Sequence, residues 1–360
     1  MRVLVAPDKF AGTLTAVEAA EAISVGWRRQ APRDELDVAP MSDGGPGFVD
    51  VLHAELGGEM LAVTVEAPHG ERVPASVLFV EDVAYVESAQ ACGLHLVDGN
   101  AEFGSTVGVG ELVLAAVESG ASRVVVGLGG SGTNDGGAGM LSALGATSDG
   151  ILDSGAIALD TVKTVDLAPA REALAGVELV AATDVDNPLT GMFGATKTFG
   201  PQKGISEDRI VEVDGWLESF AAAADKRASL EKGAGAAGGL GYAMLLLGAT
   251  RAPGLDLVAQ AVGLVERARA CDLVVTGEGA FDFSSRGGKV PYGVAMIAAD
   301  ALRPCVALAG QVLVGSREMR ALGIESAYSL VEAVGEERAF ADPAGALADL
   351  AARVARTWSV

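Results

Sequence analysis

Residues 123–140 have the sequence RVVVGLGGSGTNDGGAGM, an apolar run followed at once by a loop that is half glycine. Seven of the fourteen residues from Gly127 to Met140 are glycine. An apolar, β-branched run that ends in glycine and then gives way to small helix-forming residues is typical of a buried strand that turns into a helix. We therefore predict a strand, a tight turn and a helix here, the unit from which parallel α/β sheets are built.

The same pattern recurs towards both ends of the chain. Short β-branched runs occupy residues 2–7, 35–40, 178–184, 271–279, 304–310 and 325–331, and amphipathic stretches follow the first two at 15–30 and 47–57. Residues 60–100 instead predict a meander of three short strands, because turn residues separate the apolar runs and leave no room for helices. The simplest architecture is a doubly wound, Rossmann-like parallel-sheet domain with a second α/β domain inserted into it. We place the first domain at 1–60 and 268–360 and the inserted one at 61–267, with the active site expected in the cleft between them.

The amino-acid composition argues against several classes of binding partner. The formal net charge of −22 argues against nucleic acid or an anionic membrane surface, both of which attract basic proteins. Three widely spaced cysteines without a CxxC pair indicate a reduced, cytoplasmic chain. The apolar run at the N-terminus is too short for a signal peptide, and the longest apolar stretch, 236–249, is shorter than the ~20 residues of a membrane span.

The glycine-rich loop admits three interpretations. It is a tight turn, for which glycine supplies the backbone freedom; or a dinucleotide fingerprint, since Gly127, Gly129 and Gly132 match G-x-G-x-x-G; or a phosphate cradle of backbone N–H groups at a helix start. Asp135 favours the cradle over the fingerprint, because a carboxylate beside a pyrophosphate repels it unless a cation intervenes or the side chain caps the helix, and nucleoside triphosphates bring Mg²⁺.

Other polar loops also follow predicted strands, and we expect their side chains to converge on the crevice of a doubly wound fold. No P-loop or protein-kinase signature is present, and the three histidines have no metal-ligand spacing. The parts that remain, aspartates, lysines and glycine loops, are those that phosphoryl transfer uses. The loop residues concerned are Asp8, Lys9, Asp43, Asp184, Asp186, Lys203, Glu278, Asp282, Arg286 and Lys289.

Five motifs, in order, give the chain a resemblance to the bacterial class I glycerate kinases along nearly its whole length. The family's GGSATNDGGAGM is matched by Gly129 to Met140, with Gly132 in place of alanine. Its DVDNPL falls on Asp184 to Leu189, its FGPQKG on Phe199 to Gly204, its TGEG on Thr276 to Gly279, and its GK on Gly288 and Lys289, preceded by Asp282. The chain departs from the family pattern at Ala11, Pro46, Phe48, Ala280 and Ser284.

The resemblance implies a two-domain α/β kinase that transfers the γ-phosphoryl group of ATP, with Mg²⁺, to D-glycerate and yields 2-phosphoglycerate. Because the departures cluster, we expect the acceptor to be D-glycerate or a related small hydroxy acid. The sequence leaves open whether the protein is a monomer or a homodimer. Two alternatives stay open as well: an NAD(P)-dependent oxidoreductase that uses Gly127, Gly129 and Gly132, and a non-catalytic nucleotide-binding protein.

Roles for the site residues follow from transfer in line between bound substrates. We predict catalytic roles for Asp184, which orients or deprotonates the acceptor hydroxyl, and for Lys203, Lys289 and Lys9, which offset negative charge. The acceptor is expected to contact Asp8, Asp43, Gly44, Gly45 and Arg286. Nucleotide phosphates are expected at Gly129, Gly130, Ser131, Thr133, Asn134, Gln202 and Glu278, and Mg²⁺ at Asp135, Asp186 and Asp282.

Overall fold

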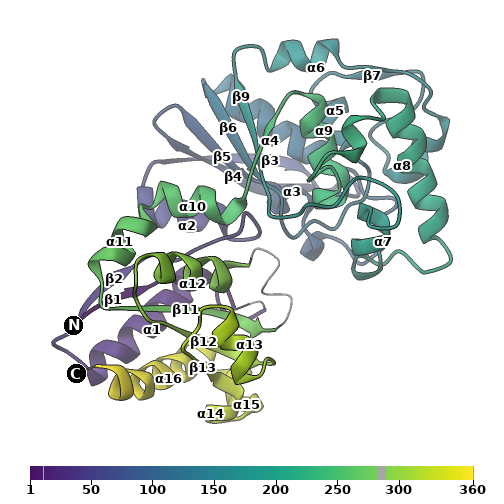
Figure 1. The fold of residues 1–360 in the computed structure, drawn as a ribbon. Coiled ribbons are helices and arrows are strands. Elements are labelled where there is room, and N and C mark those ends of the chain that lie inside the picture. Colours follow the sequence, from purple (N-terminus) through teal and green to yellow (C-terminus); the bar gives the residue numbers. More distant parts are fainter. Residues whose placement is uncertain (11, 283–288, 360) are drawn as a thin grey trace. The chain divides into compact units, whose positions relative to one another are not determined.

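The chain folds into two compact units, each described here by itself from a computed structural model (Figure 1). The structure describes residues 1–10, 12–282 and 289–359. Unit 1 comprises residues 1–43, 50–57 and 254–360, and unit 2 comprises 44–49 and 58–253. The return to unit 1 thus comes at Gly254, earlier than the predicted 268, because helices α10 (Gly254–Ala261) and α11 (Leu264–Ala270) pack against α12 (Val290–Asp300) of unit 1.

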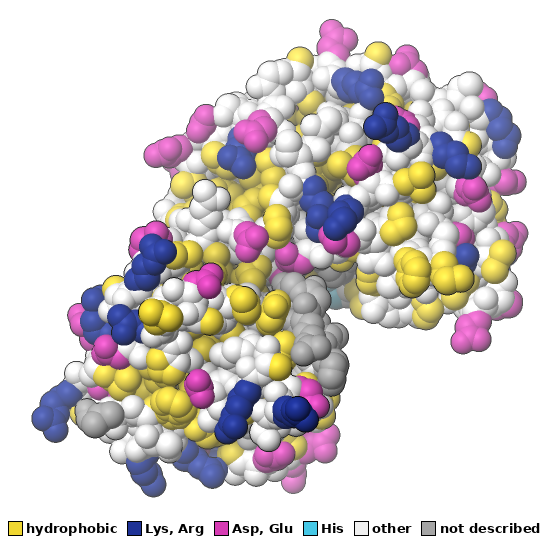
Figure 2. Space-filling view, in the orientation of Figure 1, with side chains coloured by type: hydrophobic (Ala, Val, Ile, Leu, Met, Phe, Trp, Pro, Cys, Tyr) yellow, Lys and Arg dark blue, Asp and Glu magenta, His cyan; other side chains and the backbone are white. Residues whose placement is uncertain are grey.

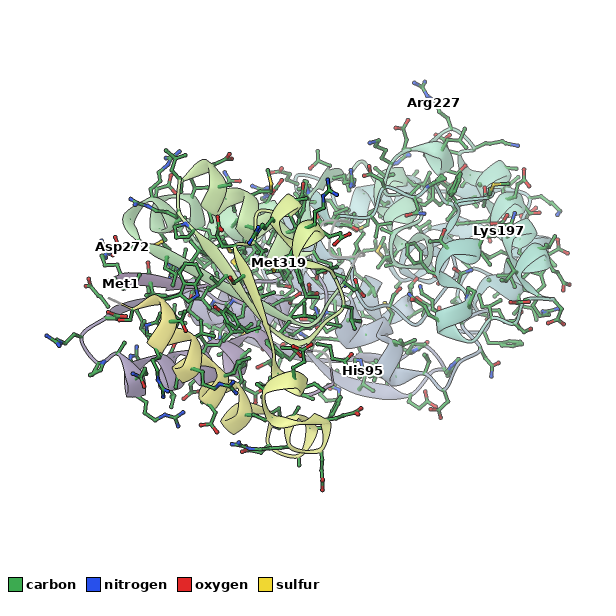
Figure 3. The ribbon with its side chains drawn as sticks, turned by 60° about the horizontal axis from the view of Figure 1, so that its bottom comes forward. Met1, His95, Lys197, Arg227, Asp272 and Met319 are labelled. Atoms are coloured by element: carbon green, nitrogen blue, oxygen red, sulfur yellow. The ribbon has the colours of Figure 1, made fainter. Side chains whose placement is uncertain are left out.

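Unit 1 is built on a five-stranded parallel sheet in the order β13-β12-β11-β1-β2. The chain moves outward from β1 to β2 on one side and from β11 through β12 to β13 on the other, so the topological switch point lies between β1 and β11. Figure 3 labels Met1 and Asp272 beside one another where these two strands begin, and the Arg2 N–H donates to Asp272 there. The strands are β1 (Arg2–Val5), β2 (Glu35–Val38), β11 (Leu273–Phe281), β12 (Cys305–Val312) and β13 (Ser326–Ser329).

Helices cover both faces of this sheet, as predicted for a doubly wound domain. Val3 and Val5 point into a core shared with α1 (Ala16–Gln30) and α16 (Pro343–Trp358), which lie side by side in Figure 1. Helix α12 packs on β11, and α11 on β1. Helix α1 begins where predicted, at Thr15, whose hydroxyl accepts from the Glu18 N–H while Glu18 accepts from the Thr15 N–H. The shorter helices are α2 (Phe48–Leu56), whose first two residues belong to unit 2, α13 (Ser316–Ala321), α14 (Leu330–Val334) and α15 (Glu336–Ala341).

Unit 2 is built on a six-stranded mixed sheet in the order β10-β9-β6-β5-β4-β3. The predicted meander is confirmed as the antiparallel part, β3-β4-β5, and β5 then pairs in parallel with β6, the apolar run of the opening motif. Strand β10 and a separate two-stranded sheet were not predicted, since each of these strands has only two or three residues. The bounds are β3 (Glu59–Glu66), β4 (Arg72–Val80), β5 (Val83–Glu87), β6 (Arg123–Gly127), β9 (Glu178–Ala182), β10 (Thr250–Ala252), and β7 (Thr147–Ser148) with β8 (Val165–Asp166).

The core of unit 2 packs helix α4 (Val107–Glu118) against the sheet and against α5 (Ala138–Ala143), the helix that follows the glycine-rich loop. The remaining helices are α3 (Ala89–Cys92), α6 (Ala168–Ala173), α7 (Ala195–Phe199), α8 (Ile210–Ala224) and α9 (Leu240–Leu246), with 3₁₀ turns η1 (Leu94–Leu96), η2 (Ala156–Thr161), η3 (Pro201–Lys203), η4 (Ala228–Leu230) and η5 (Ala236–Gly239).

The surface carries charge of both signs. Figure 2 shows Lys and Arg side chains interspersed with Asp and Glu on the visible face of each unit, without one large basic patch on that face. Among the described residues, no helix is both long and apolar enough to cross a bilayer.

Candidate active site

Six of the predicted site residues of unit 1 lie together beyond the carboxyl ends of its strands. The Asp8 N–H donates to the Gly277 carbonyl, so the loop after β1 continues beside β11 and brings Asp8 towards Glu278. The Met41 N–H donates to the Pro7 carbonyl, which sets the loop after β2 on the other side. The six residues are Asp8, Lys9, Asp43, Glu278, Asp282 and Lys289. Arg286 lies outside the described residues.

Two lysines separate the four carboxylates of this cluster. Lys9 Nζ lies 3.6 Å from Asp8 Oδ1 and 3.8 Å from Asp43 Oδ1, and Lys289 Nζ lies 3.6 Å from both Glu278 Oε2 and Asp282 Oδ1. Asp8 is only 6% exposed. Burial raises the pKa of Asp8 to about 7, with further contributions from the Asp43 and Glu278 charges, although Lys9 opposes the shift. A carboxyl pKa raised this far is more common at functional sites than elsewhere in proteins.

A cavity of about 460 Å³ lies at this cluster, on the switch point of the unit 1 sheet. Its charged lining comes from the loops after β1 and β2, from β11 and from the start of α12. Its apolar lining comes from Phe10 and from α14 and α15, which follow β13 at the opposite side of the sheet. The sequence did not indicate this apolar lining, because α14 and α15 are too short to show a helical period.

The glycine-rich loop of unit 2 begins where three parallel strands, β5, β6 and β9, end side by side. Ser88 donates its hydroxyl to the Gly127 carbonyl, and the Leu128 N–H donates to the Ala182 carbonyl. Within the described residues, the N–H groups of Gly129, Gly130 and Ser131 have no protein acceptor. Such a run of unpaired N–H groups is what an anion-binding loop requires.

A second glycine segment, Gly44–Val49, packs backbone to backbone on this loop. A Cβ on Gly129 would lie 2.4 Å from the Gly45 Cα, so no larger residue is tolerated there without movement. Phe48 is fully buried and makes an edge contact with Tyr85, which explains an apolar residue at this departure from the family pattern. Gly44 and Gly45, predicted to contact the acceptor, are therefore also needed for close packing.

Glu87, which sequence reasoning did not single out, holds the Gly44–Val49 segment in place. It is buried at the end of β5, and its Oε2 accepts from the Gly47 N–H at 3.0 Å and from the Val49 N–H at 3.4 Å. The signal was present, since an acidic residue at the end of an apolar strand is the same feature that pointed to Asp8 and Asp43.

Lys203 is a buried lysine that forms hydrogen bonds to the glycine-rich loop. The side chain is 3% exposed, and Nζ donates to Ser131 Oγ at 2.8 Å and to the Thr133 carbonyl at 2.7 Å. Burial lowers the pKa of Lys203 to about 8, a shift that the Cys92 and Asp135 charges partly oppose. The structure thus brings Lys203 to the predicted loop, where it fixes the loop conformation. Gln202, by contrast, is exposed in η3.

That the side chains of Thr133 and Asn134 contact phosphate stays a prediction. Both residues are fully buried, and Asn134 Nδ2 donates to Thr196 Oγ1 at 2.9 Å. The accessible part of the loop is limited to Gly129, Gly130 and the edge of Ser131.

Asp135 does not match the predicted magnesium role. Its Oδ2 accepts from the Thr106 N–H and Oγ1–H and from the Gly139 N–H, and its Oδ1 accepts from the Gly137 N–H, at 2.7–3.1 Å. The carboxylate thus accepts from four protein donors, three at Oδ2 and one at Oδ1. Burial raises the pKa of Asp135 and the four hydrogen bonds oppose this shift. The side chain joins the loop to α4 and α5, which is the helix-capping role left open by the sequence.

Asp184 and Asp186 both follow β9 but differ in exposure. Asp184 is half-buried, whereas the Asp186 side chain is 55% exposed and forms ion pairs with Lys232 at 2.9 Å and Arg251 at 2.6 Å. These two cations hold the pKa of Asp186 below its usual value. In the described parts of the chain, no three His, Cys, Asp or Glu side chains form a cluster able to hold a metal ion. Of the three predicted magnesium residues, Asp135 is buried, Asp186 pairs with two cations, and Asp282 lies in the unit 1 cluster beside Lys289.

The dinucleotide fingerprint is not favoured by this geometry. In that motif the glycines leave room for a pyrophosphate, but here the backbone of Gly44 and Gly45 lies against Gly127 and Gly129. The Gly132 N–H is already bonded to the Cys92 carbonyl.

Comparison with known proteins identifies the family. The glycerate kinase family model matches residues 3–359. The chain belongs to the glycerate kinase family. It is 40% identical to the glycerate kinase of Bacillus subtilis strain 168, over 94% of this chain and 93% of the relative, and 38% identical to the glycerate 2-kinase of Escherichia coli K12, over 93% and 92%.

A solved structure supports this family assignment. A crystal structure from Salmonella typhimurium LT2, assigned provisionally as glycerate kinase 2, is 33% identical and superposes with a TM-score of 0.81 over 99% of this chain and 98% of that one. The α/β fold class predicted from the sequence is therefore confirmed. As a member of this family, the chain is a phosphotransferase with an alcohol group as acceptor.

Proposed function

We propose that this chain transfers the γ-phosphoryl group of ATP to D-glycerate and forms 2-phosphoglycerate. The names of the relatives support the acceptor. The observation that carries the proposal is the unit 1 cluster, in which Lys9 and Lys289 stand between four carboxylates at a switch-point cavity. Lysines there offset the charge of an acid substrate and of phosphoryl oxygens, and carboxylates accept hydrogen bonds from its hydroxyls.

The residues present are compatible with Mg²⁺ brought by the nucleotide. Kinase magnesium is held by one or two carboxylates together with substrate phosphates, and keeps several waters. Asp282, half-exposed beside Lys289, is the described carboxylate that suits this role. When bound there, Mg²⁺ supplies positive charge to the phosphoryl oxygens.

The remaining roles in the reaction are assigned to residues of this chain. We assign the unpaired N–H groups of Gly129, Gly130 and Ser131 to nucleotide phosphate, with Lys203 as the residue that positions them. Lys9 is assigned to the acceptor carboxylate, and Asp184 to the acceptor hydroxyl, which it orients or deprotonates. An in-line transfer of this kind needs no covalent enzyme intermediate.

The test is an ADP-release assay with D-glycerate, ATP and Mg²⁺, with the product passed to enolase. Because enolase takes 2-phosphoglycerate directly, product formation without a phosphoglycerate mutase is expected. A product that enolase accepts only after mutase is added would contradict the hydroxyl assignment, and ADP release that depends on a different acid would contradict the acceptor.

A matched pair of lysine variants tests the site. Lys289→Met is expected to lower kcat/KM about a hundredfold, since one charge-stabilising group contributes roughly 3 kcal/mol to the transition state. Lys232→Met removes a lysine that is 75% exposed in its side chain and should leave kcat/KM unchanged. Equal kcat/KM values for the two variants would show that the unit 1 cluster takes no part in the reaction. Asp184→Asn is expected to abolish transfer while ATP binding survives.

A further inference from the structure

The unit 1 cavity is larger than a three-carbon acid needs. Its volume of about 460 Å³ corresponds to roughly fifteen waters at ~30 Å³ each. Glycerate has about seven non-hydrogen atoms, so it fills less than half of that space. The remaining volume has its own lining and must suit another part of the substrates.

That remaining lining is apolar and partly aromatic. Phe340 on α15 is 59% exposed although it borders the cavity, and Val331 on α14 is half-buried beside the buried Phe10. A small acid with a carboxylate and two hydroxyls gains nothing from such a wall. A planar, weakly polar ring does, because stacking on an aromatic side chain and burial of its faces are both favourable.

Gln311 adds a polar group with a defined pattern. It lies in the same cavity on β12, which continues to Val312 although its pairing with β13 ends at Ala309. A glutamine amide presents one acceptor and one donor side by side. This pair matches the N6 and N7 edge of adenine, to which Gln binds in bidentate fashion, and mismatches guanine, which has an acceptor where adenine has the N6 donor.

The order of strands places these groups suitably for a nucleotide. The apolar wall follows β13, Gln311 is on β12, and Glu278 and Lys289 flank the β11 end. A nucleoside triphosphate has the complementary order, with an apolar ring for the wall, a polar edge for Gln311 and negative charge for the Lys289 ammonium group.

We propose that the apolar side of the unit 1 cavity binds the purine base of the nucleotide substrate. Phe340 and Val331 pack on the ring, and Gln311 recognises the adenine edge. This inference rests on the ATP dependence proposed above. It assigns base recognition to residues of unit 1.

Four full-length proteins test the inference: the wild type, Phe340→Ala, Gln311→Leu, and the control Leu302→Ala, which changes a side chain that is 88% exposed and does not line the cavity. For each, Kd values for ATP and GTP are measured by calorimetry. The inhibition constant of inorganic tripolyphosphate, which has no base, and the KM for glycerate complete the set.

Phe340→Ala should weaken ATP binding at least about fivefold, the lower range of base–aromatic stacking. Gln311→Leu should reduce the preference for ATP over GTP about tenfold. Tripolyphosphate inhibition and the glycerate KM should stay unchanged in both, and the control should match the wild type throughout.

Other outcomes overturn the inference. A raised glycerate KM with unchanged ATP binding in Phe340→Ala would assign the apolar wall to the acceptor. An equal loss of ATP and GTP affinity in Gln311→Leu would show that Gln311 does not recognise the adenine edge. The proposed function fails separately, if the wild type releases no ADP with any hydroxy acid. In that case the nucleotide Kd values of the four proteins still decide the inference.

Discussion

Removal of the Asp135 carboxylate should destabilise the protein rather than weaken its use of magnesium. This side chain accepts four hydrogen bonds, three of them from backbone N–H groups, in a site with no exposed surface. In Asp135→Ala the Thr106 hydroxyl is able to rotate to another acceptor, but the three N–H groups are fixed by the chain.

The magnitude follows from those three donors. A buried, unsatisfied donor costs about 1–3 kcal/mol, so Asp135→Ala should lower the free energy of unfolding by roughly 3–6 kcal/mol if water enters the space left behind. In Asp135→Asn the amide oxygen is able to keep the Oδ2 contacts, and only the Gly137 N–H then faces an NH₂ group. Its cost should be about 1–3 kcal/mol.

Urea unfolding followed by circular dichroism measures both variants against the wild type, and the Mg²⁺ concentration for half-maximal activity is measured on Asp135→Asn. The expected order of stability is wild type, then Asn, then Ala, with an unchanged magnesium requirement. If Asp135→Ala unfolds at the wild-type urea concentration, the capping role is refuted. If excess Mg²⁺ restores lost activity to Asp135→Asn, the side chain is a metal ligand.

Three further outcomes are expected. Because the pKa of Asp8 is raised to about 7 from 3.8, the folded protein retains a proton that the unfolded chain releases. The free energy of unfolding should therefore fall as pH rises from about 4 to 7, by ~4 kcal/mol at most. Asp8→Asn should remove this pH dependence in melting curves recorded between pH 5 and 8. Lys203→Ala should lower kcat about a hundredfold but stability by only ~1–2 kcal/mol, and steady-state kinetics with full activity would refute its action on the loop. Asp186→Ala should change the free energy of unfolding by less than about 1 kcal/mol and leave the magnesium titration unaltered, since the Asp186 and Lys232 side chains are 55% and 75% exposed.

Much of the fold was predictable because its signals are local. The run at 123–127 is a buried strand, and the capping box at Thr15 fixes the start of α1 from four consecutive residues. The alternation of strands and helices then selects parallel sheets. The meander at 59–87 was equally clear, because its turns are short.

The positions of site residues were predictable where the residues lie at the end of a parallel strand or follow it directly. Asp8, Asp43 and Glu278 converge because parallel strands end at one edge of the sheet. The roles of Asp135 and Asp186 were not predictable from local sequence. Thr106 lies 29 residues before Asp135, and Lys232 lies 46 residues after Asp186, so their contacts depend on tertiary packing.

The domain boundary shows the same limit. Nothing in residues 254–270 distinguishes helices of one unit from those of the other, because amphipathic helices have the same pattern wherever they pack. Only their contacts with α12 and β1 assign them to unit 1.

The segment Gly44–Val49 determines how this protein may be divided. A recombinant fragment that starts at Gly58 and stops at Pro253 would carry every strand of the larger sheet, yet it would lack the six residues that cover Gly127, Gly129 and Glu87. Swapping the two lobes between homologues as cassettes would fail for the same reason, unless this short peptide travels with the insert. Chimeras therefore need two exchanged pieces, not one.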